Sequence, residues 1–144
     1  MRTCALAIVA VVALTVTAVN AADKAPAKKP IGSWKHTVGD NTVTFHFTPE
    51  IARTVVEAGG NTIEVEADYG ISKDGVVFGR IFKVKKGGDE GPSEGDLFSF
   101  KVAVDKNTLT LSDVKTANDS PEVKQLLQGE YQKEKTSAAR KDKK

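Results

Sequence analysis

Cysteine, tryptophan and histidine are scarce in this sequence of 144 residues. The single cysteine, Cys4, lies in an apolar N-terminal segment, so the chain after it offers no disulfide, no thiol nucleophile and no thiolate metal ligand. The two histidines, His36 and His46, fall on opposite faces of one predicted hairpin, so they cannot share a metal ion. The scarcity of these residues excludes thiol catalysis, and we expect neither a metal site nor a cofactor.

Sequence signatures of common enzyme classes are absent as well. The chain contains no GxSxG, no HExxH and no phosphate-binding GxxxxGK[ST] segment. Apart from the even positions of 76–84, which are candidates for the barrel interior, aromatic and basic residues do not alternate on a predicted sheet face, as they do in proteins that stack nucleic-acid bases. We therefore expect a protein that is not an enzyme and does not bind nucleic acid.

The N-terminal segment has the composition of a secretory signal. Arg2 precedes an apolar run over residues 5–19, and Val19 and Ala21 place small residues third and first before a cleavage site. This order predicts a signal peptide over residues 1–21. The run is shorter than the roughly twenty residues that span a bilayer. We expect an exported protein, periplasmic or extracellular, that is not integral to a membrane.

Charge is divided unevenly along the mature chain. Residues 22–30 form a predicted disordered linker with a net charge of +2, and residues 133–144 have a net charge of +4. Residues 31–132 carry eleven basic and sixteen acidic side chains, a net charge of −5. The predicted disordered tail over 135–144 and the linker are either solubilising ends or contacts to an anionic component of the cell envelope.

Residues 31–134 repeat a pattern of alternating apolar and polar residues, which is typical of strands with one buried face. A helix is predicted only before the last strand, where Ser120 is a candidate N-cap, Pro121 the first helical residue and Gly129 the stop. The segment 86–95, rich in glycine and acidic residues, is a predicted mobile loop. The predicted strands span residues 32–38, 41–48, 52–58, 62–71, 75–85, 96–104, 108–114 and 129–134.

Short turns fix the pairing of three predicted hairpins. With two-residue loops at 39–40, 59–60 and 106–107, large apolar residues of each pair of strands fall on one face. The predicted partners are Trp34 with Phe45, His36 with Val43, Val56 with Ile63, Arg53 with Glu66, Val104 with Leu109, and Val102 with Leu111.

Eight short antiparallel strands joined by hairpins favour an all-β, up-and-down barrel, because closing the sheet removes its edges. A β-sandwich is the alternative, although it requires the chain to cross between two sheets. We expect one barrel domain over residues 31–134 and a monomer.

Two short motifs resemble those of lipocalin-like (calycin-type) barrels. Gly32-Ser33-Trp34 at the start of the first strand resembles their G-x-W, and Gly129-Glu130-Tyr131-Gln132-Lys133 resembles the last strand of small secreted bacterial members. The resemblance implies that Trp34 closes one end of the barrel against a basic residue of the last strand, Lys133 or Lys135. It also implies that a small ligand can bind inside. The chain has no second tryptophan, so the resemblance does not extend to the biotin site of avidins.

Arg80 is the candidate ligand-binding residue. If the even positions of 76–84 face inward, Arg80 lies inside the barrel, where an unpaired guanidinium is costly and a ligand carboxylate is a natural partner. Tyr69, Tyr131 and His36 share the predicted inward face. The odd positions are nearly as apolar, however, and a bulge at Gly79 would turn Arg80 outward.

Two functions are compatible with the sequence. A lipocalin-like barrel would bind a small apolar or amphipathic molecule at a mouth framed by residues 86–95. A barrel filled by its own side chains would instead serve as a structural or interaction protein of the cell envelope. The acidic stripe Glu64, Glu66 and Asp68 is either a solvated strand face or a weak calcium site. The large side chains predicted to fill the interior are Trp34, Phe45, Phe47, Tyr69, Phe78, Phe82, Phe98 and Phe100.

Overall fold

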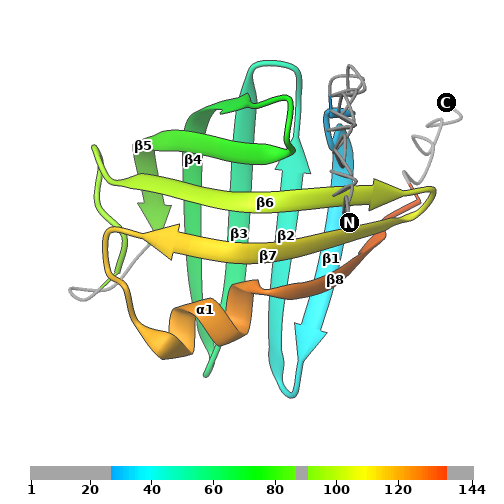
Figure 1. The fold of residues 1–144 in the computed structure, drawn as a ribbon. Helices are drawn as coiled ribbons and strands as arrows, with labels where there is room; N and C mark the ends of the chain where they lie inside the picture. Colours follow the sequence, from blue (N-terminus) through cyan, green and yellow to red (C-terminus); the bar gives the residue numbers. More distant parts are fainter. Residues whose placement is uncertain (1–26, 87–90, 136–144) are drawn as a thin grey trace, which may run out of the picture.

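Eight antiparallel strands close into an up-and-down barrel, and one short helix precedes the last strand (Figure 1). This computed structural model describes residues 27–86 and 91–135. The predicted signal peptide, residues 22–26 of the linker, residues 87–90 and residues 136–144 of the tail lie outside the described residues. The elements are β1 Gly32–Val38, β2 Asn41–Phe47, β3 Ile51–Ala58, β4 Asn61–Ile71, β5 Val76–Lys86, β6 Leu97–Asp105, β7 Thr108–Thr116, α1 Pro121–Leu127 and β8 Gly129–Lys133.

The barrel closes because β1 pairs with β2 on one side and with β8 on the other. Consecutive strands are neighbours throughout, so no connection crosses from one sheet to another. The predicted barrel is confirmed, and the alternative sandwich is not the fold. Among the described residues, no helix is long and apolar enough to cross a membrane.

The predicted pairing of the three hairpins is confirmed. Trp34 pairs with Phe45 across β1 and β2, Val56 with Ile63 across β3 and β4, and Val104 with Leu109 across β6 and β7. In each hairpin the turn residues and the alternation of apolar residues select the same register. A slip of one residue would turn every apolar side chain to solvent, so no other register buries them.

Strand β5 does not have the predicted orientation. Val77 and Ile81 are buried, whereas Phe78 and Phe82 are 54% and 39% exposed, so the predicted inward placement of both phenylalanines is wrong. No register shift occurs at Gly79. The register between β4 and β5 shifts further along the strands. Ala67 pairs with Ile81 but Glu66 pairs with Lys83, so Phe82 has no partner residue on β4.

Two glycines explain why the odd positions of β5 face inward. A Cβ atom on inward-facing Gly79 would lie 2.4 Å from the backbone oxygen of Asp68 and 2.5 Å from the ring of Phe98, so glycine makes room for both the neighbouring strand and that ring. On the outer face, a Cβ atom on Gly70 would lie 2.8 Å from the ring of Phe78, its cross-strand partner. An aromatic side chain that covers a cross-strand glycine is a known way to stabilise a sheet.

Trp34 lies at one end of the barrel interior and is 1% exposed. Its indole Nε1 donates a hydrogen bond of 2.7 Å to the backbone oxygen of Pro30. Lys133, its cross-strand partner on β8, places Nζ 5.5 Å from the centre of the ring. The segment before β1 and the last strand therefore meet on Trp34, and Lys133 rather than Lys135 is the basic residue that lies against it.

Helix α1 forms as the sequence predicts. Ser120 caps it, because its side-chain oxygen accepts from the backbone N–H of Val123, and Pro121 occupies the first turn. The helix contacts β7 and β2 and lies across the lower end of the barrel in the view of Figure 1. The hydroxyl of Tyr131 donates a hydrogen bond of 2.7 Å to the backbone oxygen of Leu127, the last helical residue. This bond ties α1 to the barrel interior.

Candidate functional site

A cavity of about 490 Å³ occupies the end of the barrel that α1 covers. This volume lies within the range of roughly 300–1,000 Å³ that is usual for small-molecule sites. Inward-facing residues of β3, β4, β6 and β7 form its wall, α1 covers one side, and the residues before β6 form its rim. The lining residues are Phe45, Thr54, Val56, Ile63, Val65, Ala67, Ile81, Gly91, Pro92, Asp96, Leu97, Phe98, Phe100, Val114, Thr116, Ala117, Asn118, Ser120, Val123, Leu126 and Leu127.

The cavity wall is largely apolar; of its polar side chains, Thr54 lies on β3 and the others gather at the rim. Thr116 donates a hydrogen bond of 2.7 Å from Oγ1 to the backbone oxygen of Asn118. Ser120 donates to Glu122 and caps α1. Asp96 accepts a hydrogen bond of 2.8 Å at Oδ2 from the backbone N–H of Ser93. An apolar body in the interior and polar groups at the rim suit an amphipathic ligand.

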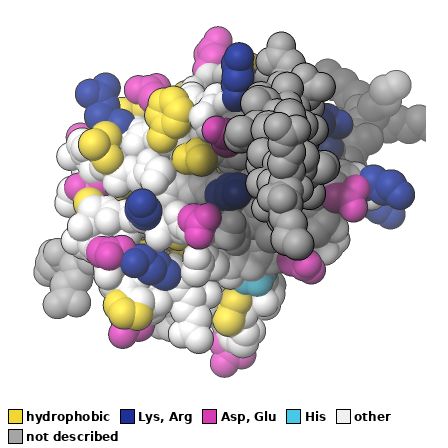
Figure 2. Space-filling view, in the orientation of Figure 1, with side chains coloured by type: hydrophobic (Ala, Val, Ile, Leu, Met, Phe, Trp, Pro, Cys, Tyr) yellow, Lys and Arg dark blue, Asp and Glu magenta, His cyan; other side chains and the backbone are white. Residues whose placement is uncertain are grey.

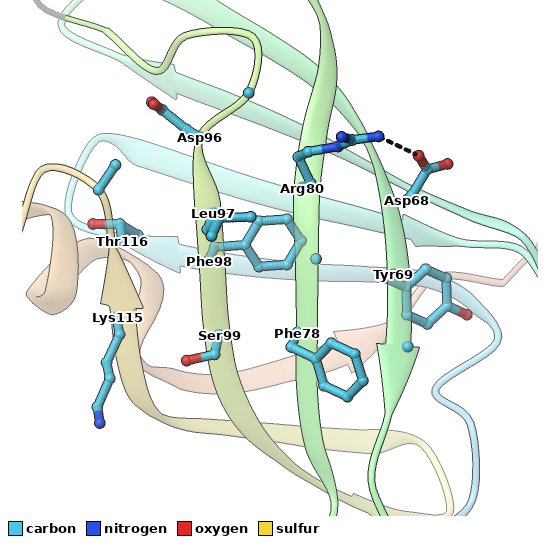
Figure 3. Close-up of a pocket in the computed structure, with 14 residues that line it drawn as sticks. Asp68, Tyr69, Phe78, Arg80, Asp96, Leu97, Phe98, Ser99, Lys115 and Thr116 are labelled. Carbon is cyan, nitrogen blue, oxygen red and sulfur yellow. Dashed lines mark ion pairs between the residues drawn. The ribbon is translucent and has the colours of Figure 1, made fainter.

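A second, open groove of about 1,010 Å³ runs along the outer face of β5 and β6 (Figure 3). It includes the exposed side chains of Phe78 and Leu97, the latter 67% exposed. Figure 2 shows hydrophobic side chains on this part of the surface among charged ones. The groove and the cavity meet, because both are lined by Asp96, Leu97, Phe98, Thr116 and Ala117.

Arg80 lies on the outer groove and outside the cavity. Its side chain is 64% exposed, and its Nη2 atom lies 4.0 Å from Oδ2 of Asp68 on the neighbouring strand (Figure 3). The inward orientation considered from the sequence is therefore not adopted. Such an exposed ion pair contributes at most about 1 kcal/mol to stability.

The other three predicted ligand-binding residues face inward but do not line the described part of the cavity. His36 and Tyr131 lie together, with ring centres 4.8 Å apart, and Tyr69 packs against Phe47 at 5.4 Å. The backbone engages each of them. His36 Nδ1 donates to the oxygen of Glu130, and the Tyr69 hydroxyl donates to the oxygen of Thr48. Burial raises the pKa of both tyrosine hydroxyls above the ordinary value.

The acidic stripe of β4 is engaged by basic side chains. Glu64 lies 2.9 Å from both Arg53 Nε and Lys85 Nζ, and Lys85 also pairs with Glu66. These bonds hold the pKa of Glu64 and of Glu66 below the usual range. Arg53 faces Glu66 across the strands, as predicted, but its ion pair is with Glu64. Within residues 27–86 and 91–135, no cluster of three metal-ligating side chains occurs.

Sequence reasoning placed Phe45, Phe98 and Phe100 in the interior but assigned none of the cavity-lining residues to a ligand site. Val56, Ile63 and Val65 follow the same alternation as any strand core, and Leu126 and Leu127 have the spacing of any amphipathic helix. A pattern of this kind identifies an inward face but does not show whether facing side chains meet. Asp96 gives no sequence signal, because it follows a glycine-rich acidic segment and resembles the residues around it.

Comparisons with protein-family models, with curated proteins and with solved structures return no match for this chain. The closed barrel with eight antiparallel strands is compatible with a lipocalin-like fold.

Proposed function

We propose that this protein is an exported, lipocalin-like barrel that binds a small apolar or amphipathic molecule in its interior. The cavity of about 490 Å³ beneath α1 carries the proposal. Its apolar wall removes a ligand's hydrocarbon surface from water, which contributes roughly 25 cal/mol for each Å² buried. The G-x-W start at Gly32 and Trp34, the Lys133 contact with Trp34 and the predicted signal peptide support a lipocalin-like, exported protein.

The alternative is a structural or interaction protein of the cell envelope. Phe78 and Leu97 favour it, because large exposed apolar side chains in one groove mark many protein interaction sites. In that function the outer groove binds the partner and the cavity has no ligand.

Native mass spectrometry of the mature protein, purified from its own cells and beginning at Ala22, separates the two functions. Under the proposed function the protein carries a species of defined mass, which solvent extraction then identifies. A clean apoprotein mass under gentle conditions would favour the interaction protein.

Two neighbouring residues of β3 provide a matched pair of variants. Val56 lines the cavity, whereas Val55 precedes it on the opposite face of the strand. Val56→Phe adds a ring inside the cavity and is expected to abolish the bound species. Val55→Phe makes the same substitution outside and is expected to retain it. Retention of the species by Val56→Phe would exclude the cavity as its site.

A further inference from the structure

The charge of the cavity wall restricts the ligand further, and this step rests on the proposed function. Among the described residues that line the cavity, Asp96 alone has a charged side chain. The other polar members are neutral, namely Thr54, Thr116, Asn118 and Ser120. We infer that the cavity takes amphiphiles with an uncharged or cationic head, such as long-chain alcohols or amines, and excludes carboxylates.

The position of Asp96 assigns it to the ligand's head. It lies at the polar rim, where the cavity meets the outer groove. The backbone N–H of Ser93 donates a hydrogen bond to its Oδ2 atom and fixes the carboxylate there. The ligand's apolar part fits among Val56, Ile63 and Val65, which line the cavity. A head at the rim is then close to a negative charge, which attracts an ammonium group and repels a carboxylate.

Three cationic side chains described near the rim are on the outer face or already paired. Arg80 points away from Asp96 and pairs with Asp68 on the outer face (Figure 3). Lys115 lines the outer groove and is not among the cavity residues. Lys124 on α1 lies 2.5 Å from Asp119. Among the side chains that the structure describes in the cavity lining, none offers a carboxylate head a cationic partner, so the head would lose its hydration without compensation there, which is strongly unfavourable.

The first turn of α1 does not compensate for this cost. Glu122 already provides a negative charge there, and the hydrogen bond from Ser120 keeps its pKa below the ordinary value. An anion at the rim would meet the carboxylate of Asp96, and the carboxylate of Glu122 is hydrogen-bonded to Ser120, which lines the cavity. The cavity has room for about sixteen water-sized groups at roughly 30 Å³ each, so a ten-carbon chain with a small head fits.

Isothermal titration of the mature protein with three probes of equal chain length tests the inference. The probes are decan-1-ol, decyltrimethylammonium and decanoate, each below its micelle concentration at about pH 8. We expect the alcohol and the ammonium to bind, and decanoate to bind at least about tenfold more weakly than either. Asp96→Asn, which preserves the acceptor for Ser93, should tighten decanoate, weaken the ammonium and leave the alcohol unchanged.

Asp68→Asn is the control, because it removes an acidic side chain of the outer groove that does not line the cavity. It should leave the order of the three affinities unchanged. Decanoate that binds as tightly as decan-1-ol would overturn the inference and leave the binding cavity standing. If Asp96→Asn leaves the affinities for decanoate and for the ammonium unchanged, the role of Asp96 is overturned. Failure of all three probes to bind would overturn the proposed function as well.

Discussion

Tyr131 joins the barrel interior to the helix that covers the cavity, and its removal has a calculable effect. The side chain is fully buried between His36 and Phe45, and its hydroxyl donates to the backbone oxygen of Leu127. That oxygen belongs to the last turn of α1, where carbonyl groups have no partner within the helix. Tyr131→Phe removes the hydroxyl alone and leaves this carbonyl without its donor. We expect the free energy of unfolding to fall by about 1–3 kcal/mol.

The stability difference between the unaltered protein and Tyr131→Phe depends on pH because the hydroxyl of Tyr131 is buried. In the unfolded chain a tyrosine hydroxyl ionises near pH 10, whereas burial raises the pKa of Tyr131 well above that value in the folded protein. The stabilisation is therefore fully present below about pH 10 and is lost as the pH rises further, because the unfolded chain releases a proton that the folded protein retains. The slope is about 1.4 kcal/mol per pH unit for one group.

Guanidinium unfolding followed by the fluorescence of Trp34 measures both effects. At about pH 8 the variant should be less stable by about 1–3 kcal/mol, and at about pH 11 the difference should narrow by about 1.4 kcal/mol. Comparison of the two proteins cancels the titration of lysines, which they share. Tyr69→Phe is the control, because Tyr69 is only partly buried. The difference in the free energy of unfolding between this variant and the unaltered protein should narrow less from about pH 8 to 11. A difference that stays constant from pH 8 to 11 would refute the reasoning.

Two further substitutions test the packing of the barrel. Gly79→Ala places a methyl group 2.4 Å from the backbone oxygen of Asp68 and 2.5 Å from the ring of Phe98, and should cost about 1–3 kcal/mol in urea unfolding. Phe98→Leu in the same chain should restore only the part of that loss that the ring causes. The prediction fails if the double variant is no more stable than Gly79→Ala. Lys133→Met removes the cation 5.5 Å from the ring of Trp34 and should cost about 0.5–1 kcal/mol, with a change in tryptophan emission. Unchanged stability and emission would show that this contact contributes nothing.

The hairpins were predictable because two independent signals agree in each of them. Gly39, Gly59 and Gly60 adopt the positive φ angles that tight turns require, and the alternation on both sides selects the same pairing. Such hairpins form a barrel when the last strand pairs with the first, because this pairing removes the two edges of the sheet.

The orientation of β5 was not predictable because both of its faces are apolar. Val77 and Ile81 compete with Phe78 and Phe82 for the interior, and size alone favours the phenylalanines. The choice depends on cross-strand contacts of Gly79 and Gly70, which alternation within one strand does not reveal. Of the two orientations that the sequence left open for Arg80, the outward one is adopted, since Arg80 shares a face with Phe78.

The existence of the cavity follows from where large side chains lie along the barrel axis. Aromatic rings pack in succession from the cavity wall toward Trp34: Tyr131 packs against Phe45 and Phe45 against Phe47, with ring centres 5.4 and 5.5 Å apart. Each aromatic side chain buries about 150–250 Å², so a few of them fill the width of a small barrel.

At the α1 end the corresponding inward positions of β3 and β4 are Val56, Ile63 and Val65, whose short, branched side chains do not reach across the barrel. Leu126 and Leu127 cover that space from the helix. One end of the interior is thus a packed core that holds the fold, and the other has the apolar room that a ligand requires. Enlarging a valine at the α1 end should therefore reduce binding at little cost to stability, whereas shrinking a ring at the Trp34 end should unfold the protein.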